Sequence, residues 1–180
     1  MKKLNFVILF SFLISSVASA GTLIEPYAGM FLNSTYDGDV EGDLSGNAVG
    51  MRLGFQQLGF MAGLDGRRAF VNLEPETGDD ADYTMTQLGF FVGYNFPVLL
   101  RVWGEYVFAL DGVNDDDSDV KLKKGSGFLI GLGYSLLPFI SLNLEYGSVG
   151  TTEIESSTGT SDLEIDNNVL FLSLSLPLTI

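Results

Sequence analysis

The chain has 180 residues, which suits a single domain, and carries 23 acidic residues against nine Lys and Arg, with no His and no Cys. This acidity argues against nucleic acid as a partner, because contacts to phosphate need Lys and Arg. The absence of His removes the commonest general base and metal ligand, and the absence of Cys removes disulfides and thiolate metal sites. We therefore expect a protein that is not an enzyme and that uses no cofactor.

Residues 1–20 have the layout of a secretory signal peptide. Two lysines near the start are followed by an apolar run, and Ala18–Ser19–Ala20 forms a small-x-small cleavage site. The alternative, a membrane anchor, is disfavoured because the run is short and the cleavage pattern follows it directly. We expect cleavage after this site, which leaves residues 21–180 as the mature chain, with seven basic residues against 23 acidic ones.

Eight later segments alternate apolar with small or polar side chains. A strand produces this period of two and a helix cannot. Most of the segments have about the length that a tilted strand needs to cross a bilayer. The expected strands are Leu23–Leu32, Asn47–Gln56, Leu58–Arg68, Tyr83–Phe96, Leu99–Leu110, Gly125–Leu136, Ile140–Val149 and Asn168–Ile180.

The connections between these strands alternate between long and short. Three are tight turns, near Gln57, near Pro97 and at Leu137–Pro138–Phe139. The other four are long polar loops: Asn33–Gly46, Ala69–Asp82, Asp111–Lys124 and Thr151–Asn167. Outer-membrane barrels have tight periplasmic turns and long extracellular loops. The pattern predicts an all-β protein, an eight-stranded antiparallel up-and-down transmembrane β-barrel in the bacterial outer membrane, with both termini periplasmic and the long loops extracellular.

Charge separates the two faces of the expected strands. One face is apolar and carries no acidic residue, whereas the other is small and polar. A Lys or Arg on a lipid-facing surface near mid-bilayer costs roughly 2–4 kcal/mol, so the apolar face is expected to meet lipid. Its aromatic residues cluster near both strand ends, as girdles at two interfaces would. Only Arg68 breaks the separation, at the loop end of its strand, where lipid phosphates could pair with it.

A soluble, secreted lipocalin-like binding barrel would reverse the two faces. Its water-facing surface would then be largely glycine with a few aromatic residues. Glycine weakens a strand and makes a poor surface residue, but it suits the crowded interior of a narrow barrel. The membrane interpretation is therefore favoured over the soluble one.

A group of charged residues falls on the polar, lumen-facing row of the strands: Glu25, Arg52, Asp65, Arg67, Arg101, Glu105 and Glu145. Buried charges must be paired or neutralised, and eight strands enclose a lumen just wide enough for side chains to fill. We therefore favour a structural network that plugs the barrel. The alternative is a gate or ion path, which would make the protein a narrow porin-like channel for ions or small solutes.

Two further patterns suggest chemistry but have simpler explanations. Three loop carboxylates have the spacing that opens an EF-hand calcium loop: Asp115, Asp117 and Asp119. Val120 replaces the required glycine and Ser126 the bidentate glutamate, so no metal site is predicted, and weak shared binding of divalent cations is the alternative. Ser173 and Ser175 lie on the lumen-facing row, where we expect them to pack rather than act as nucleophiles.

Short phrases that combine glycine with aromatic residues recur along the strands. They are IEPYAGM (Ile24–Met30), GMRLGF (Gly50–Phe55), LGFFVGYNF (Leu88–Phe96) and FLIGLGYSL (Phe128–Leu136). With these phrases and its strand pattern, the chain from residue 21 to residue 180 resembles the small eight-stranded outer-membrane barrels of the OmpA/OmpX type. In that family the last strand usually ends in Phe or Trp, whereas this chain has Pro177 and ends in Ile180. Because proline cannot donate to a ladder, this departure predicts frayed pairing at the chain end or altered recognition by the insertion machinery.

The expected role is structural, in envelope integrity or in surface interaction through four acidic extracellular loops. The expected partners are outer-membrane lipid and lipopolysaccharide, together with the barrel insertion machinery and periplasmic chaperones during biogenesis. We expect a monomer. The sequence identifies no extracellular ligand.

Overall fold

The computed structural model describes residues 21–38, 41–117, 119–137, 139–157 and 159–180. The predicted signal peptide, residues 1–20, lies outside the described residues, so its cleavage stays a prediction. Within the described part, no helix is long and apolar enough to cross a membrane. Strands account for nearly all of the described chain.

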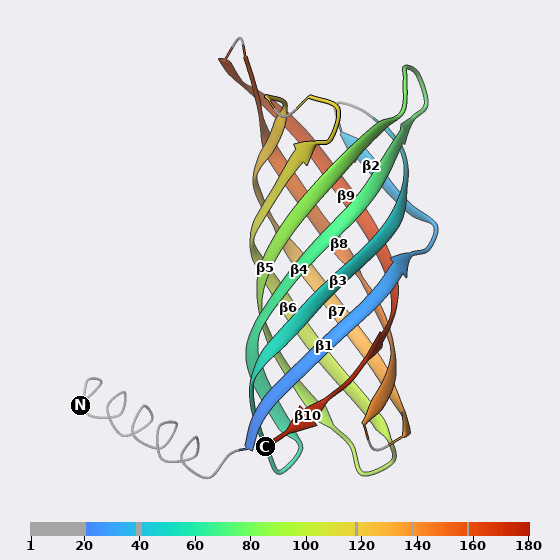
Figure 1. The fold of residues 1–180 in the computed structure, drawn as a ribbon, viewed down its shortest axis with the longest axis vertical. Coiled ribbons are helices and arrows are strands. Elements are labelled where there is room, and N and C mark those ends of the chain that lie inside the picture. Colours follow the sequence, from blue (N-terminus) through green and yellow to red (C-terminus); the bar gives the residue numbers. More distant parts are fainter. Residues whose placement is uncertain (1–20, 39–40, 118, 138, 158) are drawn as a thin grey trace, which may run out of the picture.

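Ten strands follow one another along the chain. They are β1 (Gly21–Phe31), β2 (Ser34–Gly38), β3 (Gly42–Gln57), β4 (Phe60–Pro75), β5 (Ala81–Asn95), β6 (Leu100–Asn114), β7 (Lys121–Leu137), β8 (Ile140–Ser156), β9 (Gly159–Ser175) and β10 (Leu178–Thr179). Consecutive strands from β3 to β9 pair antiparallel, and β1 pairs with both β3 and β9. β2 continues β1 between β3 and β9, and β10 continues β9 along β1. The ring therefore has eight strands, which confirms the predicted eight-stranded antiparallel barrel (Figure 1).

The first barrel strand bends between β1 and β2. Asn33 has a φ of 42°, a left-handed conformation that asparagine tolerates better than most residues. The hydroxyl of Ser34, which is buried, accepts a hydrogen bond of 3.0 Å from the backbone N–H of Leu170 in β9. The N–H of Leu32 donates to the carbonyl of Leu170 at 2.7 Å. The bend therefore keeps the first strand attached to its neighbour.

The seam that closes the ring stays paired to the end of the chain. β10 keeps the same register against β1 as β9 does. The N–H of Leu176 donates to the carbonyl of Pro26 at 3.0 Å, and Thr22 and Ile180 exchange backbone hydrogen bonds of 2.8 and 2.9 Å. Successive N–H groups of a strand point to opposite sides, so the nitrogen of Pro177 points away from β1 and removes no bond from the seam. The expectation of a frayed chain end is therefore wrong.

The two ends of the barrel differ, as Figure 1 shows. The short-turn end, at the bottom of that view, carries the turns that follow β3, β5 and β7 together with Gly21 and Ile180. The first of these turns has two residues, Leu58 and Gly59, both with positive φ, which matches the twist of a tight hairpin. The opposite end, here called the loop end, carries the connections that follow β2, β4, β6 and β8.

The long loops expected at the loop end are mostly strand. β3 begins at Gly42, β4 continues to Pro75 and β9 begins at Gly159, all within segments that were expected to be loops. The acidic residues that suggested loops occupy only the outer row of these strands. The inner row is apolar and buried, and includes Leu44, Ala69, Val71, Leu73, Tyr83, Met85, Leu122 and Ile165. The predicted loop boundaries were therefore wrong because a period of two continues beneath the acidic surface.

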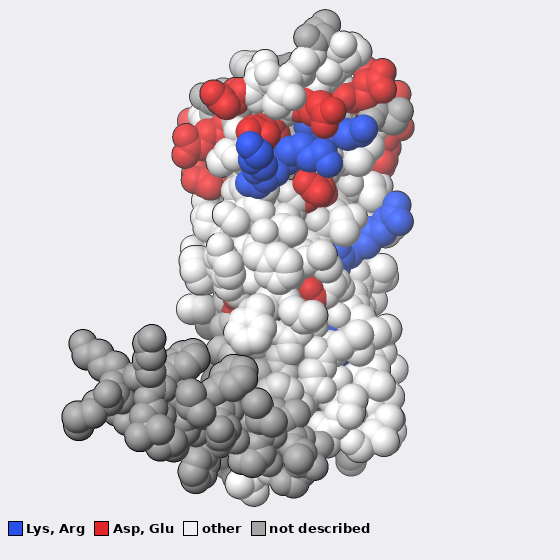
Figure 2. Space-filling model, turned by 90° about the vertical axis from the view of Figure 1, so that its left-hand side faces the viewer, with Lys and Arg blue, Asp and Glu red and all other residues white. Residues whose placement is uncertain are grey.

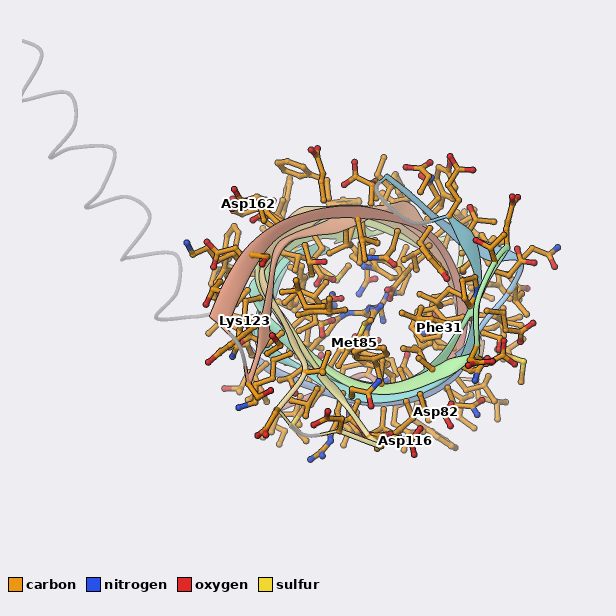
Figure 3. All side chains as sticks on the ribbon, turned by 90° about the horizontal axis from the view of Figure 1, so that it is seen from above. Phe31, Asp82, Met85, Asp116, Lys123 and Asp162 are labelled. Carbon is orange, nitrogen blue, oxygen red and sulfur yellow. The ribbon has the colours of Figure 1, made fainter. Side chains whose placement is uncertain are left out.

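Side chains alternate between the outside and the inside of the ring. The outward apolar row is exposed on every barrel strand, for example at Leu53, Leu132 and Leu144. Inside, a small apolar cluster near the short-turn end contains Leu23, Met61, Phe91 and Trp103. A larger apolar cluster fills the half nearer the loop end. Phe31 and Met85 belong to this region and point into the ring in Figure 3.

Candidate functional site

Charged side chains meet inside the barrel around Arg52. Its guanidinium contacts Glu25 at 3.2 Å and Asp65 at 2.9 Å, and it also contacts Glu145. All four side chains are fully buried. They come from β1, β3, β4 and β8, so a single guanidinium joins strands on different sides of the ring. Arginine suits this position because its planar group donates in several directions at once.

Arg67 and Arg101 extend this cluster. Arg67 contacts Glu145 through one guanidinium nitrogen and donates to the hydroxyl of Tyr27 at 3.0 Å through another. That hydroxyl in turn donates to Asp65 at 2.6 Å. Arg101 contacts Glu25 at 2.7 Å. Six of the predicted charged residues are therefore joined in one network of ion pairs, whose members are Glu25, Arg52, Asp65, Arg67, Arg101 and Glu145.

Aromatic rings complete the surroundings of the arginines. The Arg52 guanidinium carbon lies 4.5 Å from the ring centroid of Trp103 and 4.8 Å from that of Tyr27. Arg67 lies 4.5 Å from the centroid of Phe171. A cation over the face of an aromatic ring is attracted by its quadrupole, and the attraction increases when water is excluded. Tyr27 thus has a double role that the sequence pattern did not reveal, because only its lumen-facing position could be inferred.

Glu105 differs from the other predicted charges. It is buried but forms no ion pair among the described residues. One carboxylate oxygen accepts a hydrogen bond of 3.0 Å from the amide of Gln87, and the other has no hydrogen-bond partner. Gly89 on β5 leaves room for the Glu105 carboxylate, because an added Cβ at this position would lie 2.3 Å from its oxygen. The structure therefore places Glu105 in the same lumen but outside the ion-pair network.

The ring is filled by side chains at the level of the charges. Arg52, Arg101, Phe91 and Phe171 are among its largest fully buried side chains. A cavity of about 30 Å³ lies beside Arg67 and is lined mainly by apolar residues of the loop-end half. A cavity needs roughly 10–15 Å³ to hold one buried water, so this cavity has room for about two water molecules. The interior therefore resembles a packed core more than an aqueous path.

Glycine at position 131 makes room for the largest side chain of the lumen. An added Cβ would lie 2.0 Å from the indole ring of Trp103 on the neighbouring strand. We expect Gly131→Val to destabilise the barrel by about 1–3 kcal/mol, since overpacking forces neighbouring groups to move. Urea unfolding of the purified protein would measure this change in the free energy of unfolding.

The matched control for this substitution is Gly104→Val on the outer face of β6. An added Cβ at position 104 has no heavy atom within 4 Å. The control is therefore expected to leave the free energy of unfolding almost unchanged. Equal losses for the two variants would contradict the packing role assigned to Gly131.

The loop end carries the acidic surface but no assembled metal site. Within the described residues, no group of three or more acidic side chains is arranged to hold a metal ion. In the segment that resembles an EF-hand, the Asn114 side chain accepts hydrogen bonds from the N–H groups of Asp116 and Asp117. The Asp117 carboxylate accepts one from Asp119 at 3.0 Å. These side-chain oxygens stabilise the turn itself, which is the ordinary role of Asn and Asp in turns.

A second acidic group surrounds Tyr36 at the mouth of the barrel. Burial, followed by the nearby Asp43 and Asp80 carboxylates, raises the pKa of the Tyr36 phenol. The hollow beside this ring is lined by acidic side chains from β2, β3 and β4, from the connection between β2 and β3 and from the segment after β4: Asp37, Glu41, Asp43, Glu74, Glu76 and Asp80. The surface at this end therefore presents negative charge to any molecule that approaches it.

Solved structures of similar fold include two bacterial proteins. No family model and no curated protein sequence matches the chain. Neisserial surface protein A (NspA) is 12% identical, with 88% of this chain and 97% of that chain covered and a TM-score of 0.56. Ail, the attachment invasion locus protein of Yersinia pestis, is 12% identical, with 88% of this chain and 98% of that chain covered and a TM-score of 0.51. The chain therefore has the fold of the small eight-stranded outer-membrane β-barrels of the OmpA/OmpX type.

Proposed function

We propose that this protein is an integral component of a bacterial outer membrane, in which a plugged barrel anchors an acidic β-structure at the cell surface. The observation that carries the proposal is the exposed apolar band around the barrel. Figure 2 shows one face on which acidic and basic residues gather in the upper part, above a broad, almost uncharged region. An outward row of large hydrophobic residues suits lipid and would be costly in water.

The proposed orientation follows from the position of the charges along the barrel. The outward-facing acidic residues of β3, β4, β5 and the following connections lie at the loop end, above the apolar band. The short-turn end has tight connections and both ends of the mature chain. Outer-membrane barrels have their short turns in the periplasm. We therefore assign the loop end to the cell exterior and both termini to the periplasm.

The part of the barrel above the apolar band supports a role in surface interaction. Its strands keep their pairing and enclose an apolar core, so it projects as a continuation of the barrel instead of as separate loops. Its outer surface is strongly acidic, which favours a cationic or polar partner. The two proteins of similar fold are named as a surface protein and as an attachment invasion protein. We propose envelope structure or surface interaction as the role of this chain, without catalysis or a cofactor.

Other parts of this proposal concern biogenesis and assembly. Ser173 and Ser175 are buried in the lumen, and Ser175 accepts a hydrogen bond of 2.9 Å from Asn143, which suits packing better than nucleophilic chemistry. The outward face contacts lipid and lipopolysaccharide, and the protein acts as a monomer. Periplasmic chaperones and the barrel insertion machinery assist its folding, with Ile180 as an unusual last residue.

Cell fractionation tests the proposed location. The protein is expected in the outer-membrane pellet, and its mobility on a denaturing gel is expected to change on heating because a closed barrel resists detergent. A freely soluble periplasmic pool with no heat-dependent mobility would overturn the proposal. That result would favour the soluble binding barrel.

The alternative function, a narrow channel, makes a different electrical prediction. Because the ion-pair network and its aromatic neighbours fill the ring, the purified protein is expected to give little steady current in planar lipid bilayers. Single-channel recording in symmetric salt provides the measurement, with protein-free bilayers as the control. Large, steady conductance from the folded protein would contradict the plug and support the channel.

A further inference from the structure

The exposed basic side chains lie on the outside of the barrel, and on the face shown in Figure 2 they lie in the upper part of the molecule, at more than one height. Arg52, Arg67 and Arg101 are buried. The remaining basic residues of the described chain are Arg68, Lys121, Lys123 and Lys124, and none of them is buried. In the strand register, Arg68 of β4 lies opposite Thr86 of β5, and Thr86 lies opposite Asp111 of β6. Asp111 in turn faces the lysine segment of β7. A continuous row across four strands therefore has cationic side chains at both of its ends.

A β-bulge in β7 brings two consecutive lysines to the same side of the sheet. Leu110 pairs with Gly125 and Gly112 with Leu122, so Lys123 and Lys124 together face Asp111 alone. Lys124 has a φ of 57°, a left-handed conformation that is uncommon outside glycine and asparagine. The residues before and after the pair point inward and are buried, whereas the two lysine side chains are 36% and 68% exposed. Bulges commonly re-aim side chains in this way at functional places.

Aromatic residues lie directly below this lysine pair, on the apolar band. The rings of Tyr106 and Phe128 are 4.8 Å apart, and Phe108 is also exposed on the same face. Phe108, Lys123 and Lys124 line one shallow hollow on the outside of the barrel. Aromatic girdles mark the boundary between hydrocarbon and headgroups, and lysine stems reach from such a boundary into the polar layer. The two ammonium groups therefore lie at headgroup height.

The lysines retain free capacity for an anion. The ammonium of Lys123 is 3.8 Å from Asp111, and that of Lys124 contacts Glu153. Each ammonium has three donors, and such exposed pairs are weak. The hydrogen bond from Lys124 to Glu153 raises the pKa of the lysine. The carboxylates of Asp111 and Glu153 position the two lysine side chains but leave N–H donors of both ammonium groups free.

We propose that Lys123 and Lys124 form a docking site for a phosphate group of an outer-leaflet glycolipid, with its acyl chains against the aromatic residues below. Arg68, at the other end of the same row of paired residues, adds a second cationic contact. The inference rests on the proposed function, because it requires the loop end to face the outer leaflet. It deepens that function by naming the lipid chemistry and the side of the barrel that recognises it.

The test compares lipopolysaccharide binding by the folded protein and by the variant Lys123→Gln/Lys124→Asn. Asparagine is chosen at position 124 because it tolerates the left-handed backbone. Lys121→Gln is the matched control, since it removes one charge from the same strand farther from the apolar band. The double variant is expected to bind about 30-fold more weakly, from the usual effect of two cationic side chains at an anionic lipid surface. The control is expected to change affinity little.

Two further measurements complete the test. Lysine-to-arginine substitution at both positions is expected to preserve binding, and dephosphorylated lipopolysaccharide is expected to bind the wild type and the double variant equally. Equal affinity of the wild type and the double variant for the phosphorylated lipid would overturn the site, provided that both show heat-dependent mobility. Failure of the wild type itself to insert into membranes would instead overturn the proposed function.

Discussion

Replacing Arg52 by methionine is expected to cost about 3–5 kcal/mol of the free energy of unfolding, because it breaks a buried ion pair by removing one partner. Methionine keeps an unbranched apolar stem but leaves the carboxylates of Glu25, Asp65 and Glu145 without their shared cation. No water is available to these fully buried groups, so each uncompensated charge must be neutralised or moved. The loss would be measured by urea unfolding of the barrel in lipid bilayers.

Glu105→Gln provides the control for Arg52→Met. It removes a carboxyl group from the same lumen, but Glu105 takes part in no ion pair among the described residues. We expect this variant to change the free energy of unfolding by less than about 1 kcal/mol. In the double variant Arg52→Met/Asp65→Asn, part of the loss should be recovered, since Asp65 is the carboxylate that has no other ion pair among the described residues, whereas Glu25 and Glu145 keep Arg101 and Arg67. A loss below about 1 kcal/mol for Arg52→Met alone would contradict a network that stabilises the barrel.

A lysine at position 132 is expected to destabilise the protein by about 2–4 kcal/mol in a bilayer. Leu132 is near the middle of the outward apolar row of β7 and is 51% exposed. It contacts no water if lipid surrounds the barrel, so an ammonium group there must be desolvated or must deform the bilayer. In a soluble barrel the same substitution would put a charge into water and would cost little.

Ser126→Lys gives the same change in charge on the same strand, at an exposed position nearer the loop end. Lysine there is expected to cost about 0–1 kcal/mol, because the penalty falls toward the interface. Folding into lipid vesicles at increasing urea would compare both variants with the wild type. Equal stability of the Leu132→Lys variant and the wild type would contradict the membrane interpretation.

The barrel and the two faces of its strands could be predicted from the sequence. A strand alternates its side chains with a period of two, so a row of leucines opposite a row of small and polar residues reveals both the strand and its orientation. The loop boundaries could not be predicted in the same way. Along the extensions of β4 and β5, acidic residues on the outer row hid the apolar alternation of Val71, Leu73 and Tyr83.

Part of the candidate site was also readable from the sequence. All seven predicted lumen charges lie inside the ring, because strand periodicity determines the side of each residue. The sequence did not predict that Glu105 lies apart from the ion pairs. It also did not predict that Tyr27 bridges Arg67 and Asp65. Periodicity states which face a residue occupies, but not the height at which residues from different strands meet.

The sequence by itself determined the strand pattern, the segregation of charge from the apolar face and the eight-stranded ring, because each depends on local alternation and on the high cost of charge in lipid. Only the tertiary structure decided which charges meet, since partners such as Arg52 and Glu145 are 93 residues apart. It also decided that Pro177 leaves the seam paired and that a bulge turns Lys123 and Lys124 outward together. These features depend on register between neighbouring strands, which is set by the closed ring and not by any single segment.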